Sequence, residues 1–140
     1  MQNIHSSSIE LDGKAVLIKG RSGSGKSSLA LKLILRGANL IADDQTEVFL
    51  EKNRVFLRAP MSLPNGIEIR GVGIVNAPRC ERAELKFVID LSHCERERLP
   101  SPSVRSINIL GYSFPFYFFQ GIKNPADAIY ALIKFGMLEV

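Results

Sequence analysis

Short apolar runs separated by turn residues divide the chain into segments that predict strands. The apolar run at residues 15–18 and the largely apolar segment at 39–42 are typical of buried strands, and residues 85–91 predict another strand. Residues 8–11 and 106–110 alternate between apolar and polar side chains, as expected for strands with one exposed face. These segments predict a fold rich in β-structure.

Two pairs of turn residues predict β-hairpins. Asp12-Gly13 is a strong two-residue turn signal directly before the strand at 15–18. Lys52-Asn53 separates two further apolar segments, at 46–50 and 55–57. We therefore expect each pair to join two antiparallel neighbours.

Two segments carry helix signals. Residues 29–36 are rich in leucine and other good helix formers, and Gly37 follows as a stop signal. Near the C-terminus, Asn124-Pro125 resembles an N-cap with proline at the first helical position, which predicts a helix over 126–135. Strands combined with two such helices indicate an α/β fold with mixed β-sheets.

The middle of the chain combines a loop signal with an alternating segment. Prolines and an Asn-Gly pair at 60–66 predict a loop. The stretch GIEIRGVGIVN, residues 66–76, alternates as a strand, which places Glu68 and Arg70 on one face. By itself, a strand with one acid and one base is typical of a surface strand.

The segment YSFPFYFF, residues 112–119, is strongly aromatic. Pro115 argues against a central strand there, because proline cannot donate a ladder hydrogen bond. One interpretation is core with a packed edge, and the other is an interface between copies of the chain.

Composition narrows the class of protein. The 140 residues predict one domain over residues 1–140, with 46% hydrophobic and 23% charged residues. The net charge of +4 suits a phosphorylated ligand or an acidic partner, but no basic run interleaves with aromatics, so we expect no nucleic-acid partner. No apolar run approaches the roughly 20 residues that cross a bilayer, so we expect no membrane partner. The two cysteines, Cys80 and Cys94, form no metal or disulfide pattern, which fits the reducing cytoplasm.

The stretch GRSGSGKSS, residues 20–28, matches the phosphate-loop pattern GxxxxGKS at every fixed position. Its glycines allow backbone amide groups to turn toward phosphate oxygens, Lys26 can reach the β- and γ-phosphates, and Ser27 can bind magnesium. The expected strand before the loop and helix after it are the context that the motif requires. The alternative is a glycine-rich turn before a basic helix. The candidate nucleotide-binding residues are Gly20, Arg21, Ser22, Gly23, Ser24, Gly25, Lys26 and Ser27.

Two carboxylates, Asp43 and Asp44, follow the strand predicted at 39–42. One loop and one helix away from the phosphate lysine, they can act on magnesium or on an incoming nucleophile. The alternative is a solvated turn that leads into the next strand.

These motifs together resemble the catalytic domain of HPr kinase/phosphorylase. The resemblance rests on Ile4-His5, GRSGSGKS, Leu35-Arg36-Gly37, LIADD at 40–44 and IEIRGVGIVN at 67–76. It covers residues 4–76 well and the remainder weakly. The start of the chain just before His5 resembles the short forms, which lack the N-terminal domain of longer members.

The resemblance implies a protein-serine kinase that uses ATP and Mg²⁺ to phosphorylate the small phosphocarrier HPr. It also implies a P-loop kinase fold that resembles phosphoenolpyruvate carboxykinase, and a homo-oligomer, usually a hexamer. Family members can run the reverse phosphorolysis with a basic PVRPGR-like segment. Residues 111–116 stand in that region here without an arginine, and residues 77–82 replace a longer glycine-rich loop.

Carried over by the resemblance, the catalytic residues are His5, Lys26, Asp44 and Arg98. Asp44 matches the proton acceptor, His5 a histidine that tunes it, and Arg98 an active-site arginine for which Arg96 is a rival. Ser27 and Glu68 match the metal ligands, and Asp43 and Arg70 are further active-site residues. The alternatives are a small-molecule kinase on the same scaffold and a nucleotide-binding regulatory module without transfer activity.

Overall fold

The structure is a computed structural model that describes residues 1–64 and 66–138. A nine-stranded sheet forms the body of the molecule, in the order β1-β5-β6-β9-β3-β2-β4, with β11 added to β9 and β10 to β11. The strands of this sheet are β1 (Gln2–His5), β2 (Ser7–Leu11), β3 (Lys14–Lys19), β4 (Asn39–Ala42), β5 (Gln45–Glu51), β6 (Arg54–Arg58), β9 (Arg82–Asp90), β10 (Ser106–Ile109) and β11 (Tyr112–Phe118).

Strand β3 lies in the centre of this sheet and leads into the phosphate loop. It pairs antiparallel with β2 and parallel with β9, so Lys19 and Asp90 end side by side. Both predicted hairpin turns are confirmed: the turn residues Asp12, Gly13, Lys52 and Asn53 all have positive φ.

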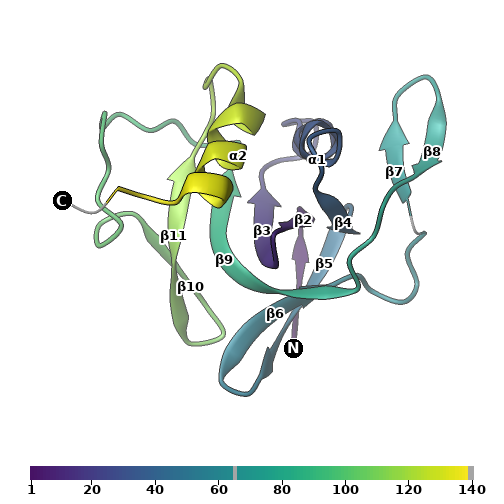
Figure 1. Cartoon of the computed structure of the whole chain (residues 1–140), viewed down its shortest axis with the longest axis horizontal. Coiled ribbons are helices and arrows are strands. Elements are labelled where there is room, and N and C mark those ends of the chain that lie inside the picture. Colours follow the sequence, from purple (N-terminus) through teal and green to yellow (C-terminus); the bar gives the residue numbers. More distant parts are fainter. Residues whose placement is uncertain (65, 139–140) are drawn as a thin grey trace.

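Two helices, α1 (Lys26–Ile34) and α2 (Pro125–Phe135), pack on one face of the sheet (Figure 1). Alternate β3 residues divide between the two cores: Val16 and Ile18 pack with the helices, whereas Ala15 and Leu17 face the opposite core. The sequence prediction of a mixed α/β fold is therefore confirmed. The loop between β3 and α1 is anchored by a buried strand and by a helix with one buried face.

Both helices differ from the sequence prediction at one end. α1 ends at Ile34 with Leu35 as its C-cap, two residues before the predicted end at Arg36. Gly37, with φ +106°, lies in the turn that follows: its amide donates to Ile34 O and the Ala38 amide to Leu33 O, both at 3.0 Å. At α2, Asn124 occupies the N-cap, but its side chain makes no capping hydrogen bond. Its backbone carbonyl accepts from Asp127 N at 3.1 Å, and its φ of 54° suits asparagine.

The stretch 66–76 is a hairpin, not the single strand that its alternation predicts. β7 (Gly66–Ile69) pairs antiparallel with β8 (Gly73–Asn76), and Arg70 lies in the turn. Gly66 was expected in a loop but begins β7, where a Cβ would lie 2.6 Å from Val75 O; Asn65 lies outside the described residues. The hairpin stands apart from the main sheet, beside α1 (Figure 1).

The aromatic segment is strand β11, which has neighbours on both sides but along different halves. Residues up to Pro115 pair with β10, and residues from Phe116 pair with β9. Pro115 therefore pairs with β10 only, among the pairings described. Its second side has no ladder partner, so the missing N–H leaves no hydrogen bond unmade on that side. The side chains of Phe114 to Phe119 are half-buried. This burial favours the interpretation of the segment as core with a packed edge over that of an open interface surface.

Candidate active site

The loop between β3 and α1 has the form of a phosphate site. The Lys26 side chain is buried, and its Nζ donates to the carbonyl oxygens of Gly20 (2.9 Å) and Arg21 (3.0 Å). Within the described part of the chain, α1 has no side-chain cap and no acid in its first turn. Its first amide groups and its positive dipole end are therefore available to an anion.

Position 20 requires glycine for two reasons, its backbone conformation and the close approach of a neighbouring side chain. The φ of Gly20 is +155°, and a Cβ there would overlap Ser24 Oγ. We expect Gly20→Ala to reduce stability by about 1–3 kcal/mol because it adds strain at both points. Chemical denaturation measures this change. Gly111→Ala is the matched control, since Gly111 has positive φ and open space around it; equal losses in the two variants would contradict the close contact.

The Asp43 carboxylate contacts the first turn of α1, directly after the phosphate loop. Its Oδ1 accepts hydrogen bonds from Ser27 Oγ at 2.7 Å and from Ser7 Oγ at 2.8 Å. Ser7, on β2, is fully buried. Asp43 thus holds the Ser27 hydroxyl in place from the end of β4.

Asp44 has a different environment from Asp43. It has φ +76°, an uncommon value for a residue other than glycine, and its carbonyl accepts from Ser6 N at 3.0 Å. Its side chain is 68% exposed, and Oδ1 lies 3.5 Å from His5 Nδ1. The two adjacent carboxylates therefore differ: Asp43 is engaged with hydroxyl groups, and Asp44 faces open space beside a histidine.

A cavity of about 580 Å³ brings the predicted residues together from four separate segments. It contains His5, the second half of the phosphate loop, Asp44 from the β4–β5 turn, and Glu68 with Arg70 from the β7–β8 hairpin. Glu68 and Arg70 thus reach one cavity although Arg70 lies beyond the end of β7. Its lining is His5, Ser7, Ser22, Gly23, Gly25, Lys26, Ser27, Ser28, Leu31, Asp44, Glu68, Ile69 and Arg70.

The donor atoms in this cavity fit magnesium. The Ser27 hydroxyl and the Glu68 carboxylate line it together, and Asp43 contacts Ser27. Within residues 1–64 and 66–138, no three His, Cys, Asp or Glu side chains form a metal-binding group. Magnesium needs none, because it retains waters and binds through one or two carboxylates plus substrate phosphates.

Arg98 is not brought into this cavity. Arg98 and its rival Arg96 are both exposed, and neither lines either cavity beside the phosphate loop. Their segment is anchored by Glu95, whose carboxylate accepts two hydrogen bonds of 2.7 Å from Arg105. The hydrogen bonds from Arg105 lower the pKa of Glu95 to about 2.

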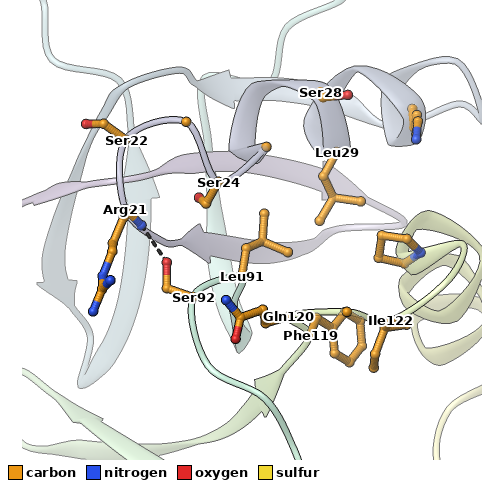
Figure 2. A pocket seen from close by; sticks show the side chains of 15 residues that line it. Arg21, Ser22, Ser24, Ser28, Leu29, Leu91, Ser92, Phe119, Gln120 and Ile122 are labelled. Atoms are coloured by element: carbon orange, nitrogen blue, oxygen red, sulfur yellow. Dashed lines mark hydrogen bonds between the residues drawn. The ribbon is translucent and has the colours of Figure 1, made fainter.

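Sequence reasoning missed the residues that hold the loop from its other side. Asp90, buried at the end of β9, accepts from Ser92 N at 2.7 Å, and Ser92 Oγ accepts from Arg21 N at 2.7 Å (Figure 2). Asp90 Oδ2 also lies 2.9 Å from His93 Nδ1. The one signal in the sequence was an aspartate at the end of an apolar strand. Its role depends on the parallel pairing of β9 with β3, which places Asp90 beside the start of the phosphate loop.

The chain matches a known protein family. The family model described as the HPr serine kinase C-terminal domain matches residues 1–102. The chain belongs to this family. The HPr kinase family membership that the sequence motifs suggested is thus confirmed, and the family accounts for the motifs from His5 to Asn76.

Relatives and a solved structure agree with the HPr kinase family. An HPr kinase/phosphorylase of Mycoplasma genitalium is 35% identical over 130 residues, which are 84% of this chain and 42% of that protein. One from Lactobacillus acidophilus is 41% identical over 97 residues, 64% of this chain and 30% of that protein. The chain therefore spans less than half the length of these relatives. The structure of the Hpr(Ser) kinase/phosphatase from Coxiella burnetii superposes with a TM-score of 0.80 at 28% identity, over 96% of this chain and 89% of that one.

Proposed function

We propose that this chain is an ATP- and Mg²⁺-dependent protein-serine kinase that phosphorylates an HPr-type phosphocarrier. The observation that carries the proposal is the single cavity shared by Lys26, Ser27, Asp44 and Glu68. The names of the relatives supply the substrate class. Residues 1–140 act in this proposal as one catalytic domain.

In the proposed reaction, the loop amides and Lys26 hold the triphosphate. The serine hydroxyl of the substrate attacks the γ-phosphorus, the bond to the β-phosphate oxygen breaks, and ADP leaves. Asp44 orients the hydroxyl and accepts its proton, and His5 influences the basicity of Asp44. Positioning and electrostatics carry most of such a transfer.

Ser27 and Glu68 would hold magnesium, and Asp43 would orient Ser27. Bound magnesium supplies positive charge against the phosphoryl group during transfer. Arg70 lines the same cavity and would add a second positive charge there. For Arg98 the resemblance is the only support, and Arg96 remains its rival, because both lie exposed outside the cavity.

Incubation with γ-labelled ATP, Mg²⁺ and either HPr or a panel of small metabolites distinguishes the kinase from its alternatives. Label on HPr supports the proposal, and label on a metabolite alone indicates a small-molecule kinase. Nucleotide binding without transfer indicates a regulatory module. Pyrophosphate release from phosphorylated HPr on addition of inorganic phosphate tests the reverse phosphorolysis.

We also propose that copies of the domain associate, as the family resemblance implies. Exposed apolar side chains support this, among them Val72 (73% exposed) and Ile74 (62%) on the β7–β8 hairpin. Of the aromatics in β11, Tyr112 is the most exposed at 40%, so β11 offers less free apolar surface than its sequence suggested. The longer of the two described helices, α2, has 11 residues, about half of what a membrane-spanning helix needs.

We expect sedimentation velocity at micromolar concentration to show a species larger than the monomer, with a hexamer as the expected state. Ile74→Lys places a charge on the exposed hairpin and is expected to shift the distribution toward smaller species. A monomer across the whole concentration range would contradict the association.

A further inference from the structure

A second cavity, of about 490 Å³, lies on the other side of the phosphate loop. It shares Ser22, Gly23, Gly25 and Ser28 with the catalytic cavity, so the loop forms a common wall between them. It contains none of the acids or histidines that surround the catalytic cavity.

The direction of the nucleotide follows from the placement of the reactive groups. In the proposed reaction the γ-phosphoryl group lies with Lys26, Ser27 and Asp44, in the catalytic cavity. A triphosphate that passes through the loop from that end leaves its nucleoside on the opposite side. The second cavity occupies that side and adjoins the same loop residues.

The walls of the second cavity have the chemistry of a base-binding site. Apolar side chains from three segments surround it: Leu29 from α1, Leu91 after β9, and Phe119 with Ile122 after β11 (Figure 2). Apolar and aromatic walls with a few polar groups are typical of small-molecule sites. Gln120 is exposed on this wall, and its amide has one donor and one acceptor end, the pair that recognises adenine.

The cavity is also built to a fixed shape. Backbone hydrogen bonds hold its far wall: Phe119 N donates to Asp90 O at 2.8 Å, and Gln120 N donates to His93 O at 3.0 Å. Ser92 joins this wall to the loop through the Arg21 amide (Figure 2). Ser24 Oγ lines the same cavity and is buried without a hydrogen-bond partner among the described residues, so it has an unused polar group for a ligand.

We propose that this second cavity binds the adenine base of the nucleotide, between the apolar side chains of Leu29, Phe119 and Ile122, with Gln120 as the polar contact that selects the base. The inference rests on the proposed kinase function and goes beyond it, because it assigns base recognition to the 119–122 segment. This segment lies about a hundred residues beyond the phosphate loop in the sequence.

The test compares ATP with inorganic tripolyphosphate, which has the phosphates but no base. Titration calorimetry in Mg²⁺ gives the Kd of both ligands for the wild type, Gln120→Ala and Ile122→Ala. We expect each substitution to raise the Kd of ATP by about tenfold, the scale of a lost base contact, with the Kd of tripolyphosphate within about twofold. Lys123→Ala is the control, since Lys123 is exposed in the same segment but lies outside the cavity.

Unchanged ATP affinity in both cavity variants would overturn the assignment, and so would equal weakening of ATP and tripolyphosphate. A wild type that binds neither ligand would overturn both the assignment and the proposed kinase function. A wild type that binds ATP through Gln120 but transfers no phosphate to HPr would support the base site and overturn only the kinase function.

Discussion

Replacement of Lys26 by methionine is expected to reduce phosphoryl transfer by about 10²–10³-fold, the usual cost of removing one preorganised electrostatic contact to a reacting group. Lys26 is a charged side chain placed at the first turn of α1 beside the phosphate loop, and it lines the catalytic cavity. Its Nζ has only loop carbonyls as partners in the described residues, and we expect phosphate oxygens to replace them when a nucleotide binds. We therefore expect the Lys26 charge to contribute more to phosphate binding than to the stability of the fold.

Methionine keeps most of the aliphatic stem of Lys26, which packs in a buried position. We expect Lys26→Met to fold, with a cooperative thermal transition close to that of the wild type. Single-turnover transfer measures the loss, and Lys123→Met is the control for the removal of one positive charge. Transfer within about twofold of the wild type, a barrier change well under the ~1.4 kcal/mol of a tenfold effect, would contradict the role of Lys26.

Asp44→Asn is expected to reduce transfer by about 10²–10⁴-fold, the range for loss of a general base. The variant keeps the shape of the side chain and the positive φ, which asparagine tolerates. ATP binding should remain near the wild-type value, because in the proposed site Lys26, Ser27 and the loop amides would carry it. Nucleotide binding and single-turnover transfer, measured on the same preparations, separate these two effects.

Asp43→Asn is the matched comparison, one residue away. Its Oδ1 receives two hydroxyl hydrogen bonds, and an asparagine oxygen can still accept them without the charge. We expect a smaller loss of transfer and a weaker Mg²⁺ affinity, through a less firmly held Ser27. A loss of transfer in Asp43→Asn together with retained transfer in Asp44→Asn would reverse the assignment.

Local signals were sufficient to predict the phosphate loop and the two hairpins. The motif GRSGSGKS predicts a strand before it and a helix after it. The turns at Asp12-Gly13 and Lys52-Asn53 need only their neighbouring residues to form. The hairpin at 66–76 was missed because its alternation continues on both sides of the turn, so the pattern does not reveal the reversal of direction.

Contacts between distant segments could not be read from the sequence. Ser7 supports Asp43 from 36 positions away, and Ser92 supports Arg21 from 71 positions away. These pairs depend on which strands of the sheet become neighbours, and no short motif records that order. The family resemblance, in contrast, anticipated the grouping of His5, Asp44 and Glu68 around one cavity.

The most direct test of the account is the identity of the phosphorylated residue on an HPr-type protein. The protein is incubated with γ-labelled ATP, Mg²⁺ and HPr, and the labelled residue is located by peptide mass spectrometry, with Asp44→Asn run in parallel. We expect label on one serine of HPr, and we expect this label to depend on both Mg²⁺ and Asp44. Label on another residue type, or equal labelling by Asp44→Asn, would contradict it.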